Sequence, residues 1–152
     1  MDQGAKTLQE NNTHHAFINA GGDLKTLGSR PDKQAWEIGL QHPRKLESIL
    51  PSFSLSGKAV ATSGDYQKYF NHDGTRYYHI LNTKTGYSLT GMKSTILVTD
   101  TMMGADALST ALFVMKKRLG FHRLPEKYRR PHRWPEQVTS FIQGMRLSQF
   151  LP

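Results

Sequence analysis

The feature that most restricts the possible folds of this chain is an apolar run that changes from strand-like to helix-like spacing. Residues 95–99 (TILVT) have the composition of a buried β-strand, and the apolar residues that follow, through Leu112 and Phe113, have helical spacing. Gly104 lies between the two and permits a tight turn. That turn predicts that Asp106 falls in or near the first helical turn, where the helix dipole favours a carboxylate. The chain therefore combines strands with at least one helix.

Asp106 and Thr110 are four residues apart, so on a helix they share one face. A carboxylate beside a hydroxyl is a pair of hard oxygen ligands of the kind that Mg²⁺ or Ca²⁺ accepts. In the alternative interpretation Asp106 caps the helix and Thr110 bonds its own backbone. The two residues alone leave both interpretations open.

Length and composition narrow the class of protein. The chain has 152 residues, enough for one domain with a core. It contains no cysteine, which excludes disulfides, thiol nucleophiles and thiolate metal sites. We find no apolar run of transmembrane length and no signal peptide at Met1, and these observations leave the compartment undecided.

Positive charge is concentrated at the C-terminal end. Nine of the 20 Lys and Arg residues, but two of the 12 Asp and Glu residues, follow Met115, together with four of the seven prolines. The net charge of +8 therefore belongs mainly to residues 116–152. This change in composition predicts two regions, a domain over 1–115 and a basic, Pro/Arg-rich tail over 116–152.

The sequence pattern of the domain predicts many short strands with a helix near each end. This arrangement is typical of an α+β fold with mostly antiparallel pairing. The segment 58–66 is rich in small residues, which suits either a tightly packed strand or a surface for a flat or anionic ligand. His79 is either a structural strand residue or a catalytic one. Residues 71–75 contain Asp-Gly and predict a hairpin turn. We expect a helix over 2–11 and strands over 15–20, 23–28, 35–40, 49–55, 58–66, 76–81 and 94–99.

Five segments in order resemble one family, the ApbE-type flavin transferases (FAD:protein FMN transferases). They are residues 17–23 (FINAGGD), 36–43 (WEIGLQHP), 59–66 (AVATSGDY), 78–86 (YHILNTKTG) and 105–110 (ADALST). The resemblance implies an ApbE-like, T-fold-related domain. It also implies Mg²⁺-dependent chemistry: FMN moves from bound FAD to a Thr or Ser hydroxyl of an acceptor protein, and AMP is released. A pyrophosphate requires a hard cation, and catalysis is then mostly positioning and electrostatics.

The resemblance also assigns residues. It places Asp106, Thr110 and the backbone carbonyl of Ala5 as metal ligands, and it places His79 where a histidine would help to deprotonate the acceptor hydroxyl. It implies that an acceptor flavoprotein of a membrane redox complex is the partner, and a periplasmic or membrane-anchored location is typical of the family. The positions that would contact FAD are Asp2, Leu8 and Ile80.

Two departures from the family pattern matter. The match covers the C-terminal half of the family, so the fold is expected to be incomplete at its N-terminus and to self-associate through exposed core. After Met115 the family's glycine, helix and final strand are replaced by the basic tail. A shift of reading frame near Lys116 and a disordered, solvated tail both explain this, and the gene's nucleotide sequence would separate them.

Two other functions remain as alternatives. The chain could be a truncated, non-catalytic fragment of the family. It could instead bind nucleic acid through the basic and aromatic residues 129–134 (RRPHRW), although the domain lacks a nucleic-acid-binding module and we predict against this partner. The sequence contains no phosphate-loop, Rossmann or nucleophile-elbow motif.

Overall fold

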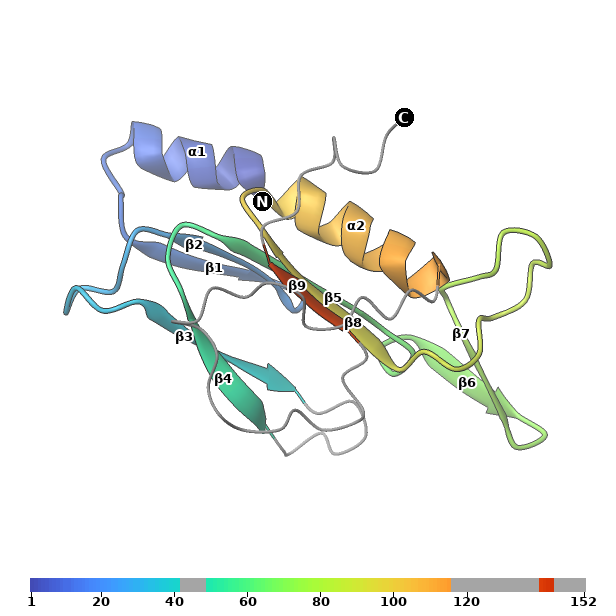
Figure 1. Cartoon of the computed structure of the whole chain (residues 1–152). Coiled ribbons are helices and arrows are strands. Elements are labelled where there is room, and N and C mark those ends of the chain that lie inside the picture. The colour runs from blue at the N-terminus through green and yellow to red at the C-terminus, as the bar shows by residue number, and fades with distance from the viewer. Residues whose placement is uncertain (42–48, 116–139, 144–152) are drawn as a thin grey trace.

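A five-stranded sheet organises the chain (Figure 1). The structure is a computed structural model, and it describes residues 1–41, 49–115 and 140–143. Neighbouring strands pair in the order β1 to β2, β5, β8 and β9, antiparallel except for the parallel β8–β9 pair. The mostly antiparallel α+β fold predicted from the sequence is thereby confirmed. The strands are β1 (Ala16–Ala20), β2 (Asp23–Leu27), β5 (Ala59–Gly64), β8 (Ser94–Thr99) and β9 (Ser140–Gln143).

Helix α2 (Met102–Met115) packs on one face of the sheet, over β5 and β8 (Figure 1). Three of the four side chains in this contact are alanines: Ala59 and Ala61 of β5 form a buried cluster with Met102 and Ala105 of α2. Alanines on both surfaces let the helix lie close to the strand. The small residues of this segment therefore form a tightly packed strand, one of the two interpretations left open by the sequence.

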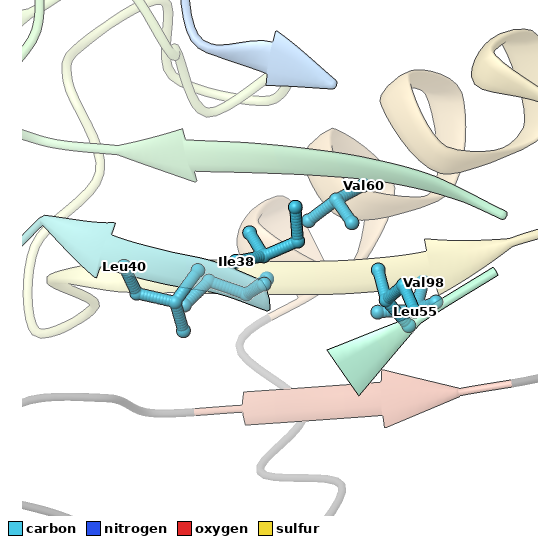
Figure 2. Close-up of a cluster of buried hydrophobic side chains, with 6 residues drawn as sticks. Ile38, Leu40, Leu55, Val60 and Val98 are labelled. Carbon is cyan, nitrogen blue, oxygen red and sulfur yellow. The ribbon is translucent and has the colours of Figure 1, made fainter. Parts of the chain in front are cut away.

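The hairpin of β3 (Trp36–Gln41) and β4 (Ile49–Leu55) covers the opposite face of the sheet (Figure 1). Because side chains alternate along a strand, Val60 points to this face while its neighbours in β5 point to α2. Figure 2 shows the resulting core between hairpin and sheet. Its buried members are Ile38, Leu40, Leu55, Val60, Ile96 and Val98.

A second hairpin, β6 (Tyr69–His72) and β7 (Thr75–Tyr78), confirms the turn predicted from Asp73-Gly74. Both turn residues have positive φ, 46° and 71°, as a two-residue turn of this kind requires. The strand expected over 76–81 is shorter than predicted and ends at Tyr78. Beyond it the chain leaves the hairpin, because Leu81 bridges to Ser88.

Helix α1 (Asp2–Glu10) confirms the predicted N-terminal helix, and it lies on the same side of the sheet as α2 (Figure 1). Ala5 is its buried residue. In the predicted tail, residues 140–143 form β9 at the edge of the sheet. The other predictions for 116–152, including the basic run 129–134, lie outside the described residues. No helix in the described ranges is long and apolar enough to cross a membrane.

The core between the sheet and the β3–β4 hairpin gives a stability prediction. Ile96 is 2% exposed and lies in the middle of that core. Ile96→Ala should lower the free energy of unfolding by about 2–5 kcal/mol, because it removes buried methyl groups and leaves a cavity. The measurement is urea denaturation. Leu81→Ala, at a side chain that is 48% exposed, is the control and should cost about 0.5 kcal/mol or less; equal losses would contradict this account of the core.

Candidate metal centre on helix α2

The start of α2 differs from the sequence-based expectation. The helix begins at Met102, so Gly104 is inside it and Asp106 is its fifth residue, beyond the first turn. The prediction that Gly104 makes a tight turn is therefore wrong, and so is the alternative that Asp106 caps the helix. Gly104 instead permits a close approach, since a Cβ there would make a tight contact of 3.0 Å with Thr101 Oγ1.

Other groups cap the helix. The two carboxylate oxygens of Asp2 accept hydrogen bonds from the backbone N–H groups of Met102 at 2.8 Å and Met103 at 2.9 Å. Thr101 accepts the next two, from Gly104 to its hydroxyl at 3.1 Å and from Ala105 to its carbonyl at 3.0 Å. The N–H groups of Met102, Met103 and Gly104, which have no partner inside the helix, are thereby satisfied, and the Ala105 N–H makes the first intrahelical bond. Asp106 is consequently not needed as a cap.

The electrostatics of Asp2 fit this capping role. Partial burial raises its pKa, but the hydrogen bonds from Met102 and Met103 and the positive charge of Lys25 outweigh burial, so the pKa is lowered from its ordinary value of 3.8. The negative charge also lies at the positive end of the helix dipole. The sequence placed Asp2 at FAD; in the structure it joins the start of α1 to the start of α2.

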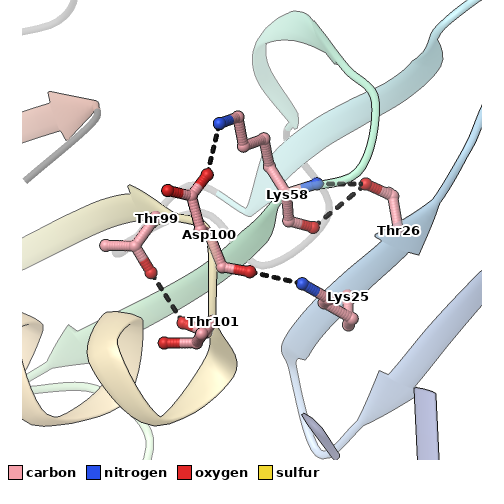
Figure 3. A network of polar contacts seen from close by, with 6 residues as sticks. All are labelled: Lys25, Thr26, Lys58, Thr99, Asp100 and Thr101. Carbon is pink, nitrogen blue, oxygen red and sulfur yellow. Dashed lines mark hydrogen bonds and ion pairs between the residues drawn. The ribbon is translucent and has the colours of Figure 1, made fainter. Parts of the chain in front are cut away.

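A buried lysine secures the loop before α2 (Figure 3). Lys25 is 8% exposed, and its ammonium donates to the backbone carbonyl of Asp100 at 2.5 Å. The Asp100 carboxylate pairs with the ammonium of Lys58, whose backbone bonds Thr26 on β2. Burial lowers the pKa of Lys25, while the charges of Asp2 and Asp100 oppose that shift. Sequence analysis missed this residue, because a lysine in a short alternating strand usually faces water.

Thr110 does not bond its own backbone, contrary to the alternative drawn from the sequence. Its hydroxyl lies 3.0 Å from the hydroxyl of Ser63 on β5, which in turn lies 2.8 Å from the hydroxyl of Ser109. Ser109 makes the backbone bond instead, donating to the Asp106 carbonyl at 3.0 Å. The exposed Asp106 carboxylate makes no hydrogen bond or ion pair with any part of the chain that the structure describes. Both predicted ligands thus keep oxygen lone pairs for another partner.

Asp23, at the start of β2, lies close enough to Asp106 for the two negative charges to interact. Burial raises its pKa, and so does the negative charge of nearby Asp106, while a hydrogen bond from the Thr62 backbone opposes the shift. The fold therefore brings a second carboxylate close to Asp106. Sequence patterns assigned Asp23 no role beyond the turn at Gly21-Gly22, where both glycines have positive φ. The local signal for Asp23 was an acid directly after two glycines.

These groups fit a hard cation by their chemistry. Carboxylate and hydroxyl oxygens suit Mg²⁺, which usually keeps several waters and takes few protein ligands. Within residues 1–41, 49–115 and 140–143, no three His, Asp or Glu side chains gather as a metal cluster. A cation here would therefore depend on hydroxyl, backbone, water and substrate oxygens as well. Ala5 follows Asp2 by three residues on α1, so it lies on the face that meets α2.

The remaining predicted residues lie on two other elements. Leu8 follows Ala5 on the same face of α1 and is half-buried. Ile80 is buried in a cluster with Tyr78 and Phe113, near the C-terminal part of α2. His79 beside it is exposed, and its backbone N–H bonds the Lys68 carbonyl. No contact between described residues joins His79 to Asp106 or Thr110.

A small cavity lies on the opposite face of the sheet from α2. Its volume is about 180 Å³, well below the several hundred Å³ of a pocket for a drug-sized ligand. It therefore does not hold a flavin by itself. Its lining residues are Asn19, Gly22, Leu24, Gly39, Leu40, Val60, Thr62, Tyr66, Gln67 and Ile96.

Comparison with known proteins decides the family. The ApbE family model matches residues 1–129. The chain belongs to the ApbE family. An FAD:protein FMN transferase of Klebsiella pneumoniae is 37% identical over 70% of this chain and 32% of its own length. One from Haemophilus influenzae is 33% identical over 76% of this chain and 34% of its own length. The chain thus spans about a third of the length of these curated relatives.

Solved structures of the ApbE family agree with the fold. The crystal structure of an ApbE protein from Thermotoga maritima matches with a TM-score of 0.71 and 40% identity, over 75% of this chain and 37% of that one. The flavin transferase ApbE from Vibrio cholerae matches with a TM-score of 0.64 and 30% identity, over 75% of this chain and 36% of that one. The resemblance drawn from five sequence segments is therefore confirmed.

The capping role of Asp2 predicts a pH-dependent loss of stability. At neutral pH, Asp2→Asn should lower the free energy of unfolding by about 1 kcal/mol, because one charge-assisted hydrogen bond and the dipole interaction are lost. Since the folded pKa lies below 3.8, the wild-type advantage is fully present above that pH and disappears as pH falls through the folded value. Urea denaturation at neutral and strongly acidic pH measures it; a pH-independent difference would contradict the role.

The same substitution at Asp23 should act in the opposite direction. Its folded pKa is raised above 3.8, so the ionised carboxylate opposes folding at neutral pH, and this penalty disappears as pH falls below 3.8. In the absence of divalent cations, Asp23→Asn should therefore increase the free energy of unfolding at neutral pH, by about 0.2–1 kcal/mol. Asp73→Asn, in the exposed hairpin turn, is the matched control and should have no effect. A destabilised Asp23→Asn variant would refute the like-charge interpretation.

Proposed function

We propose that this chain provides the Mg²⁺-binding part of an FAD:protein FMN transferase. The reaction transfers FMN from FAD to a Thr or Ser hydroxyl of an acceptor flavoprotein and releases AMP. The observation that carries the proposal is that helix α2 uses neither the Asp106 carboxylate as a cap nor the Thr110 hydroxyl for a backbone hydrogen bond. The names of the curated relatives support the same reaction.

Asp106, Thr110 and the backbone carbonyl of Ala5 would hold the cation. When bound, Mg²⁺ would neutralise charge on the pyrophosphate of FAD and make it a better target for a hydroxyl. The protein's own contribution is to fix the ligands: α2 sets the spacing of Asp106 and Thr110, and Ser63 on β5 fixes the Thr110 hydroxyl. This is catalysis by positioning and electrostatics, as phosphoryl-group chemistry generally requires.

We assign His79 to the acceptor side of the reaction. Its side chain is exposed, so an acceptor hydroxyl can reach it. An imidazole is the side chain best suited to accept a proton near neutral pH. Leu8 and Ile80 would border the flavin, with Ile80 held in place by its core neighbours Tyr78 and Phe113. Asp2 would act on FAD indirectly, by holding the first turn of α2.

An in-gel flavin fluorescence assay tests the proposal. The chain is mixed with FAD, Mg²⁺ and an acceptor flavoprotein, with a full-length family member as positive control. We expect fluorescent acceptor, at least about 100-fold less with Asp106→Ala or after removal of Mg²⁺, because charge stabilisation at the pyrophosphate is lost. His79→Ala should slow labelling by about 100-fold or more, while His72→Ala in the exposed hairpin should not. Absence of labelling at any chain concentration would refute the activity.

A further inference from the structure

Three hydroxyl groups form a connected series between β5 and α2. Ser63, Ser109 and Thr110 are linked by contacts of 2.8 Å and 3.0 Å, and Ser109 also contacts the Asp106 carbonyl at 3.0 Å. Ser63 is 7% exposed and Ser109 is fully buried, so solvent does not replace these bonds. Three contacts must therefore be served by the three hydroxyl protons.

Counting those protons fixes the direction of every bond. A carbonyl cannot donate, so the Ser109 proton goes to the Asp106 carbonyl. Ser109 must then accept from Ser63, and Ser63, having used its one proton, must accept from Thr110. The Thr110 proton consequently points at the sheet. Its oxygen lone pairs are left for the outer side of α2.

We propose that Ser63 and Ser109 are positioning residues which make the Thr110 hydroxyl an acceptor toward the bound cation. The inference rests on the proposed function, in which Thr110 is a metal ligand. A hydroxyl binds a cation through a lone pair, and a proton turned toward the cation would repel it. By holding that proton on the sheet side, Ser63 prepares the ligand before the cation arrives. Outer-shell hydrogen bonds of this kind commonly determine affinity at metal sites.

The two serines also determine which side-chain rotamer Thr110 adopts. A threonine in a helix divides its χ1 between two rotamers, because its hydroxyl can also bond a carbonyl one turn earlier. For Thr110 that carbonyl is Asp106, which already accepts from Ser109. Ser109 therefore competes for the alternative acceptor while Ser63 supplies the preferred one. The two serines thus select the same Thr110 rotamer in complementary ways.

A purely structural role for the serines gives a different expectation. Buried hydroxyls that only hold α2 on β5 would contribute to folding stability and leave cation affinity unchanged. Ser88 supplies a matched comparison, because its partly buried hydroxyl donates to the Tyr78 carbonyl and accepts from the Tyr78 backbone N–H, both at 2.8 Å. Ser88→Ala removes comparable hydrogen bonds that do not involve Ser63, Ser109 or Thr110.

The experiment is a Mn²⁺ titration of the full chain followed by electron paramagnetic resonance, at a temperature where circular dichroism shows each variant folded. We expect Ser63→Ala and Ser109→Ala each to weaken Mn²⁺ binding by about tenfold or more, and Ser88→Ala to leave it unchanged even if its melting temperature falls. If Ser63→Ala does not fold, Ser109→Ala decides alone. Without the Ser109 hydroxyl, the Ser63 proton is free to be donated to Thr110, and the direction of the Ser63–Thr110 hydrogen bond is reversed.

Each other outcome has a definite meaning. Wild-type affinity in the folded serine variants would overturn the inference, and so would an equal loss in Ser88→Ala. If Asp106→Ala abolishes binding while the serine variants retain it, the metal site stands and the positioning role fails. No Mn²⁺ binding by the wild-type chain would overturn the metal site, and the inference with it.

Discussion

The close contact between β5 and α2 is the constraint on which the rest of the structure depends. Alanines at 59 and 61 leave room for the helix to lie against the strand. Two residues further on, that closeness brings the Ser63 hydroxyl within hydrogen-bonding distance of Ser109 and Thr110. Larger side chains on this face of β5 would move the helix outward and break those bonds. Packing and site geometry therefore have the same origin.

The other face of β5 is buried as well. Val60 packs into the core beneath the β3–β4 hairpin (Figure 2), so the strand is buried on both sides. At its β2 side, Lys25 and the polar groups around Asp100 fix the loop that precedes α2 (Figure 3). The position of α2 is thus determined from beneath by packing and from its end by hydrogen bonds.

Local patterns in the sequence were enough to predict most elements, because strand alternation, the Asp73-Gly74 turn and the helical spacing are short-range signals. The start of α2 was predicted less well. The helix begins at Met102, two residues before the turn expected at Gly104, so Asp106 is an exposed side chain and not a cap. The residue that caps the helix is Asp2, which lies 100 positions before Met102 in the sequence. The buried Lys25 and the Asp23–Asp106 pair likewise depend on contacts between strands and helices that no local pattern encodes.

The capped start of α2 has a consequence for how phosphate groups can be recognised. Free N–H groups at a helix start commonly bind phosphate, but here Asp2 and the Thr101 hydroxyl already accept hydrogen bonds from Met102, Met103 and Gly104. An approaching pyrophosphate would meet the negative charge of Asp2 rather than a positive helix end. In the proposed metal site, anion recognition by this part of the fold would pass from the backbone to a metal ion. Such a division would make nucleotide binding respond to the cation concentration of the surroundings.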